Sequence, residues 1–154
     1  MTVEIKQMPE LRVATVRHVG PYNQISQAFE RLAAIAGPAG LFAQPGAAMV
    51  GIYHDIPDTT PQDQLRSDAG IVIPEGGPLP DGLAEERLPA GRYACTLHVG
   101  PYEQLGDAWA RLMGEWLPAS GHRIGPAASY EIYHNTPAEV RKEDLRTELC
   151  IPLA

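Results

Sequence analysis

His18-Val19-Gly20-Pro21-Tyr22 returns 80 residues later as His98-Val99-Gly100-Pro101-Tyr102. The same offset relates further identical residues without a gap, namely Ala28, Arg31 and Leu32 with Ala108, Arg111 and Leu112, Ile52-Tyr53-His54 with Ile132-Tyr133-His134, and Leu65-Arg66 with Leu145-Arg146. About 23 of the 65 positions from Met8 to Val72 are identical, which chance does not supply in a gapless register. The chain is therefore expected to be one domain, 1–154, made of two repeats (about 3–73 and 88–153) joined by a Pro/Gly-rich linker, 74–87.

Each copy shows the periodicities of three strands and one helix. Runs rich in β-branched and aromatic residues predict strands at 11–17, 47–54 and 65–73, and again at 92–97, 129–134 and 145–153. After each Gly-Pro turn the apolar residues fall on one face of a helix: Ile25, Ala28, Phe29, Leu32, Ile35 and Ala36, then Leu105, Ala108, Trp109, Leu112 and Trp116. Gly37-Pro38 is expected to end the first helix, and Pro118 with Gly121 the second.

The unit is thus β-α-β-β, and two units give two helices and about six strands. Helices that arise from the same place in each unit favour one face of an antiparallel-rich sheet, so the fold class is α+β with pseudo-twofold symmetry. A ligand cleft is expected at the junction between the copies, because such junctions are favoured sites for small molecules.

Charge and composition exclude several classes of function. The 154 residues carry 12 Lys and Arg against 19 Asp and Glu, a formal charge of −7, which argues against direct nucleic-acid binding. The longest apolar runs fall far short of the roughly 18 to 20 residues that span a bilayer. The N-terminus lacks the apolar core of a secretory signal, so a cytoplasmic location is expected, with Cys95 and Cys150 reduced and acting as small apolar residues.

Substitutions between the two copies point to the chemistry, and the sharpest is Gly51 against Glu131. Alternation along the strand 129–134 places Glu131 and Tyr133 on one face. A Glu flanked by apolar and aromatic residues is poorly solvated unless its face opens onto a cavity, and Gly51 removes bulk from the matched position. The alternative is a solvated Glu paired with an arginine such as Arg123 or Arg146.

Four of the six tyrosines form matched pairs, Tyr22 with Tyr102 and Tyr53 with Tyr133. A tyrosine lines a pocket with its flat face while its hydroxyl finds a polar partner, although ordinary core filling explains these residues as well. Phe29 and Trp109 lie on the apolar helix stripes and are interpreted as core.

Other polar residues give weaker signals. Glu148 and its counterpart Asp68 lie on the third strands, as a second pocket acid or simply on an exposed face. The histidines and cysteines show no metal-binding spacing, so no metal is expected, and no nucleophile, phosphate-loop or cofactor motif is present, so no cofactor is expected either.

Several of these strings together resemble the GyrI-like family, and the resemblance covers essentially the whole chain. They are His18-Val19-Gly20-Pro21-Tyr22, Tyr53-His54-Asp55 with Pro57-Asp58 and Leu65-Arg66, Tyr130-Glu131-Ile132-Tyr133, and Glu148-Leu149 with Ile151-Pro152. The family is similar to the effector-binding domains of multidrug-responsive and Rob-type regulators and includes the bacterial DNA gyrase inhibitor. The resemblance implies a tandem β-α-β-β fold and a pocket glutamate, which falls on Glu131. The two copies consume the length, so no helix-turn-helix segment is expected.

Three functions follow. The first is a small-molecule binding protein that takes up lipophilic aromatic, often cationic compounds between Glu131, Tyr133, Tyr22, Tyr102, Tyr53 and Gly51. The second, which the resemblance implies, is a hydrolase of cyclopropane-bearing, DNA-alkylating natural products, with Glu131 as acid or base and Tyr133 orienting the reacting group. The third is a protein-interaction role like that of the gyrase inhibitor, in which DNA gyrase or a regulator is the partner.

Overall fold

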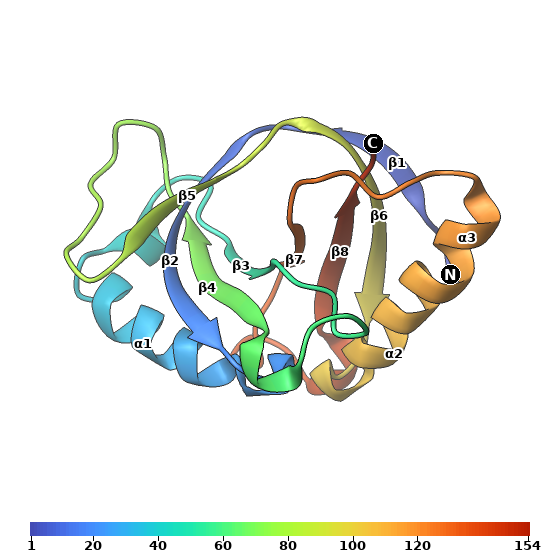
Figure 1. The fold of residues 1–154 in the computed structure, drawn as a ribbon. Coiled ribbons are helices and arrows are strands. Elements are labelled where there is room, and N and C mark those ends of the chain that lie inside the picture. The colour runs from blue at the N-terminus through green and yellow to red at the C-terminus, as the bar shows by residue number, and fades with distance from the viewer.

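Eight strands form one curled antiparallel sheet in the computed structural model, which describes residues 1–154 (Figure 1). The strands are β1 (Glu4–Met8), β2 (Leu11–Val19), β3 (Met49–Tyr53), β4 (Arg66–Val72), β5 (Ala84–Leu88), β6 (Gly91–Val99), β7 (Ser129–Tyr133) and β8 (Arg146–Pro152). Their order in the sheet is β1-β6-β8-β7-β3-β4-β2-β5. Exchanging each of β1 to β4 with its counterpart among β5 to β8 gives the same order read from the opposite edge of the sheet. The predicted α+β class is confirmed.

Six of the eight strands coincide with predicted ones to within two residues at either end, and β1 and β5 were not predicted. Both are edge strands with charged side chains, and most of their residues are at least partly exposed, so they carry no apolar pattern to read. β5 occupies the last part of the expected linker 74–87. The two strands pair across the halves, β1 with β6 and β5 with β2, and they arch over the sheet in Figure 1.

Each helix begins after the expected Gly-Pro turn. A single 3₁₀ turn (Tyr22–Gln24) leads into α1 (Ser26–Ala36), and its counterpart (Tyr102–Gln104) leads into α2 (Leu105–Arg111). The second helix continues through a π turn (Leu112–Trp116) into α3 (Leu117–Ser120), so it ends at Gly121. The prediction that Pro118 with Gly121 ends the helix is confirmed for Gly121, whereas Pro118 does not stop the helix, because it lies in the first turn of α3, where a missing N–H is tolerated.

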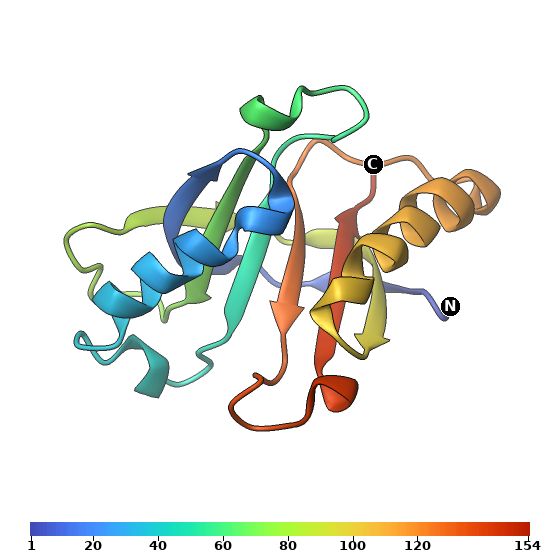
Figure 2. The same cartoon turned by 90° about the horizontal axis from the view of Figure 1, so that it is seen from below.

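Both helices lie on the same face of the sheet, with β3 and β7 running between them (Figure 2). α1 packs Ala28, Leu32 and Ala36 against Ala14 and Ile71, and the second helix packs its own apolar stripe against β6 and β8. The opposite face curls around a third core cluster: Val13, Val50, Ile52, Leu88, Tyr93, Cys95, Tyr130 and Cys150. The cysteines are buried and free, as expected. No helix is long and apolar enough to cross a bilayer.

The two halves meet where β3 pairs with β7. In this ladder Gly51 lies directly opposite Glu131, and Met49 lies opposite Tyr133. Gly51 and Glu131 are also equivalent in the 80-residue offset, so the local twofold relation passes through this one pair. The register thus places the sharpest difference between the halves at the centre of the sheet.

Close packing at the centre of β4 generates a stability prediction. A Cβ on Gly70 would collide with a methyl of Val13 and approach Val50 Cγ2 to 3.1 Å. We expect Gly70→Ala to lower the free energy of unfolding by about 1 to 3 kcal/mol, the usual cost of overpacking a core. Gly114→Ala is the matched control, because its Cβ would enter open space on a helix and should be neutral or stabilising by up to about 1 kcal/mol. Urea unfolding measures both, and equal effects would contradict the packing argument.

Candidate functional site

Glu131 is a buried carboxylate in the middle of the sheet. Its residue is only 3% exposed, and its side chain lies on the face that carries the helices. Trp109 on α2 donates its indole N–H to Oε1 at 2.5 Å, and the hydroxyl of Tyr133 donates to Oε2 at 2.6 Å. The prediction of a Glu sharing a face with Tyr133 is therefore met in the geometry, whereas the alternative partners Arg123 and Arg146 make no contact with it.

Six aromatic rings form two series of edge-to-face contacts beside this carboxylate, Tyr22–Tyr53–Trp109 and Phe29–Tyr133–Tyr102. Tyr53 lies with its ring centre 6.0 Å from that of Trp109, and Tyr133 lies 5.6 Å from Phe29. The outer members are Tyr22, 4.8 Å from Tyr53, and Tyr102, 5.8 Å from Tyr133. Such T-shaped pairs are the arrangement that ring quadrupoles favour. All four tyrosines singled out in the sequence thus come together here, which core filling alone did not require.

Gly51 makes room for the two central phenols. A Cβ at this position would lie 2.9 Å from the hydroxyl of Tyr133 and 3.1 Å from that of Tyr53. Because glycine has no side chain, both hydroxyls can reach the centre of the site, above the strand pair. The space left by Gly51 is filled by these hydroxyls rather than being open.

The junction beside Glu131 and Gly51 is occupied by side chains. A hollow of about 320 Å³ does lie between the two halves, beside Met49 and Tyr133, and another, of about 630 Å³, lies beside β1 and β6. Of the predicted site residues only Tyr133 lines either of them. Tyr102 is the most accessible of the four tyrosines, at 36% exposure.

Burial dominates the electrostatics of the site. It raises the pKa of Glu131, and hydrogen bonds from Tyr133, Trp109 and Tyr53 oppose that rise. Burial also raises the pKa of Tyr53 and Tyr133 well above the usual range, so both phenols keep their protons and act as donors. No Lys, Arg or His forms an ion pair with Glu131, and the interaction with His98, beyond ion-pair distance, is the smallest of the influences that lower its pKa, so an ionised carboxylate here has no counter-charge in contact with it.

The sequence reasoning missed Trp109 and Phe29 as members of this site, because both lie on apolar helix stripes. They do pack against the helix-facing cores, but they also form the walls beside the carboxylate. A signal existed in the repeat: Phe29 and Trp109 are matched positions, as are Gly51 and Glu131. The half with the carboxylate has the indole donor on its helix, and the half with glycine has a ring without one.

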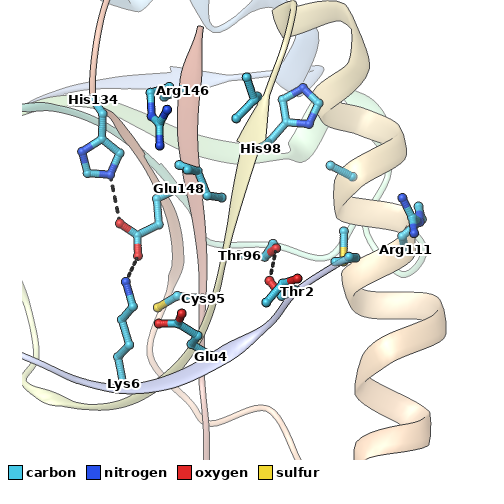
Figure 3. Close-up of a pocket in the computed structure, with 14 residues that line it drawn as sticks. Thr2, Glu4, Lys6, Cys95, Thr96, His98, Arg111, His134, Arg146 and Glu148 are labelled. Atoms are coloured by element: carbon cyan, nitrogen blue, oxygen red, sulfur yellow. Dashed lines mark hydrogen bonds and ion pairs between the residues drawn. The ribbon is translucent and has the colours of Figure 1, made fainter. Parts of the chain in front are cut away.

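Glu148 and Asp68 lie on the opposite face of the sheet and belong to separate clusters. Neither is on an exposed strand face, since Asp68 is 1% and Glu148 is 8% exposed. Figure 3 shows Glu148 between Lys6 and His134, which contact its two oxygens at 2.9 Å each. Neither carboxylate is therefore a second acid of the Glu131 site.

The fold and site together define an α+β domain whose two halves hold one buried acid among aromatic side chains. The chain belongs to the family described as the GyrI-like small molecule binding domain, whose model matches residues 1–154.

Individual relatives agree with this assignment. The chain is 31% identical over 139 residues to a DNA gyrase inhibitor of Yersinia enterocolitica, covering 85% of this chain and 84% of the relative. The structure of EcmrR in a complex with DNA matches with a TM-score of 0.77 at 20% identity, over 99% of this chain, and this chain spans 57% of its length. SAV2435 bound to tetraphenylphosphonium matches with a TM-score of 0.66 at 13% identity, over 100% of this chain and 94% of SAV2435. The two structural matches, at these identities, show the fold alone.

The raised pKa of Glu131 predicts how stability depends on pH. Because the unfolded chain ionises this carboxyl first, near pH 4.5, the folded state loses stability as pH rises from there through the higher folded pKa. Glu131→Gln removes this dependence, so the stability of the variant relative to the wild type should increase as pH rises above about 4.5, until the carboxyl of the folded wild type is fully ionised. Thermal unfolding at several pH values measures the difference, and a relative stability of the variant that falls with rising pH would contradict the burial argument.

Proposed function

We propose that the chain binds flat lipophilic compounds, cationic ones above all, at Glu131. One observation carries the proposal: a buried carboxylate, held by Trp109 and Tyr133 within a group of six aromatic side chains, forms no ion pair with a cation of the protein. A cation with apolar substituents supplies the missing counter-charge and offers surface to the rings. The membership of the chain in a small-molecule binding family supports the same conclusion.

The physical terms favour a cation over a neutral molecule of equal shape. A buried charge without a partner costs several kcal/mol, and an incoming cation offsets that cost. Each ring face that meets the cation adds about 0.5 to 2 kcal/mol. A neutral compound gains only from the burial of its apolar surface, about 25 cal/mol for each Å².

Ligand entry requires the aromatic side chains to move. The space above Gly51 is filled by the hydroxyls of Tyr53 and Tyr133, so a ligand must displace at least one of these phenols. Tyr102 lies at the outer end of its series of rings and is partly exposed, which makes it the natural point of entry. The displaced rings would then pack against the bound ligand.

Replacing the acid tests the proposal directly. Glu131→Gln should weaken binding of tetraphenylphosphonium by about 10- to 100-fold, because a contact to a charged group is worth about 1.5 to 3 kcal/mol. Binding of neutral triphenylphosphine oxide should change far less. Isothermal titration calorimetry measures both compounds with the wild type and the variant.

Glu148→Gln is the matched control, since it makes the same change in a buried carboxylate of the neighbouring strand that faces away from the site. It should leave both affinities close to those of the wild type. Equal losses for the cationic and the neutral probe in Glu131→Gln would refute the role of charge. The absence of any binding by the wild type would refute the proposed site.

The hydrolase alternative has weaker support. The site does contain an acid and a phenol within hydrogen-bond distance, the pair that such a reaction uses. Both oxygens of Glu131, however, already accept hydrogen bonds, from Tyr133 and Trp109, so the carboxylate is not aimed at an attacking water. Binding requires a phenol to move but no oxygen of Glu131 directed at a water, and for that reason we rank it first.

A protein-interaction role has separate support, because relatives at 28 to 31% identity are DNA gyrase inhibitors. The net charge of −7 suits a basic partner, and such an association is strongest at low ionic strength. If the role extends to this chain, it should lower the supercoiling activity of DNA gyrase and be captured with it at low salt, with both effects weakening as salt is added. Full supercoiling activity at a large molar excess of the chain would exclude this function.

A further inference from the structure

A cluster of polar side chains on the face opposite Glu131 has no part in the proposed function. His54 follows β3, Asp68 lies on β4 and Glu86 lies on β5, and their ligand atoms are all within 4.8 Å of one another. His54 Nε2 lies 2.6 Å from Asp68 Oδ2 and 3.4 Å from Glu86 Oε1. We propose that these three residues form a binding site for a divalent transition-metal ion, with Zn²⁺ as the best match.

The donor set fits that ion. Imidazole nitrogen and carboxylate oxygen bind Zn²⁺ at about 2.0 to 2.2 Å, so tetrahedral ligands lie about 3.4 Å apart. The separation between His54 and Glu86 already has this value, and that between His54 and Asp68 widens when the metal replaces the proton that they share. Three protein ligands leave a fourth position for water.

The surroundings hold the ligands in place. Arg17 donates to both oxygens of Asp68, from Nε to Oδ1 at 2.5 Å and from Nη2 to Oδ2 at the longer distance of 3.4 Å, while Oδ2 lies closer to His54, at 2.6 Å. An outer partner of this kind fixes the orientation of a ligating carboxylate. Asp68 is buried, whereas the side chains of His54 and Glu86 are 18% and 24% exposed, so an ion can reach the cluster from their side.

The matched cluster of the other half shows what the position of Glu86 does. There His134 and Glu148 take the places of His54 and Asp68, and Lys6 takes the place of Glu86. Lys6 Nζ lies 2.9 Å from Glu148, so a positive charge of the protein already neutralises that carboxylate (Figure 3). With Glu86, two carboxylates face one guanidinium, and one negative charge remains for a cation to balance.

No sequence motif indicates this site. Its ligands lie 14 and 18 residues apart on separate strands, so the short spacings that reveal most metal sites are missing. Glu86 also fell in the segment interpreted as a linker. Only the pairing of β5 with β2 brings it over the end of β3.

Metal titration of the purified full chain tests the proposal. After dialysis against a chelator, the wild type should bind one equivalent of Zn²⁺ by calorimetry, and Co²⁺ should give the visible absorption of a site with nitrogen and oxygen ligands. Glu86→Lys, which copies the arrangement of the other half, should weaken binding by at least about tenfold, since even the loss of an outer partner costs 10- to 100-fold. Circular dichroism verifies that this variant is folded.

Two controls distinguish this cluster from other groups of the chain that could bind a metal ion. Lys6→Glu changes the charge at the matched position and leaves the three ligands intact, so it should keep at least the wild-type equivalent. Cys95→Ser with Cys150→Ser removes the thiols that lie beside Glu148 and should also keep it. Absence of binding in the wild type, undiminished binding in Glu86→Lys, or loss of binding in either control would overturn the proposal. None of these results depends on whether a ligand binds at Glu131.

Discussion

The pairing of β3 with β7 is the contact on which the rest of the structure depends. It joins the halves into one sheet, and its antiparallel register places Gly51 of one half directly opposite Glu131 of the other. A slip of one residue would turn the carboxylate toward the core formed around Tyr130 and away from the indole of Trp109. Tyr53 and Tyr133 stand on the two strands of this ladder, and Trp109 reaches Glu131 from α2.

Most of the fold could be predicted because the same sequence patterns occur in both repeats. The matched apolar stripes gave both helices, and the alternation along the inner strands gave six strands and the face of Glu131. β1 and β5 escaped because an exposed edge strand needs no apolar pattern, and the continuation past Pro118 depended on a π turn that no local signal marks. The tandem duplication itself stays a prediction from the sequence, with which the order of the strands agrees.

The candidate site was predictable only in part, for a physical reason. Glu131 and the tyrosines stood out because polar or amphipathic groups in strands need a partner or a cavity. Trp109 did not, since an aromatic side chain can pack in a core and donate a hydrogen bond at once, and the helix period reports only the packing. That Glu131 is enclosed rather than open followed from the positions of two hydroxyls, which depend on the tertiary structure alone.

The crossed pairing of the edge strands sets the order in which the molecule can be completed during synthesis. β1 lies near the start of the chain, but its partner β6 ends at Val99, so the first strand leaves the ribosome long before anything is present to pair with it. β2 likewise waits for both β4 and β5. Translation delivers residues at about 5 to 20 per second, which leaves these edges open for several seconds. The charged residues of β1, Glu4 and Lys6, are of the kind that discourages pairing with other strands while β1 waits for β6.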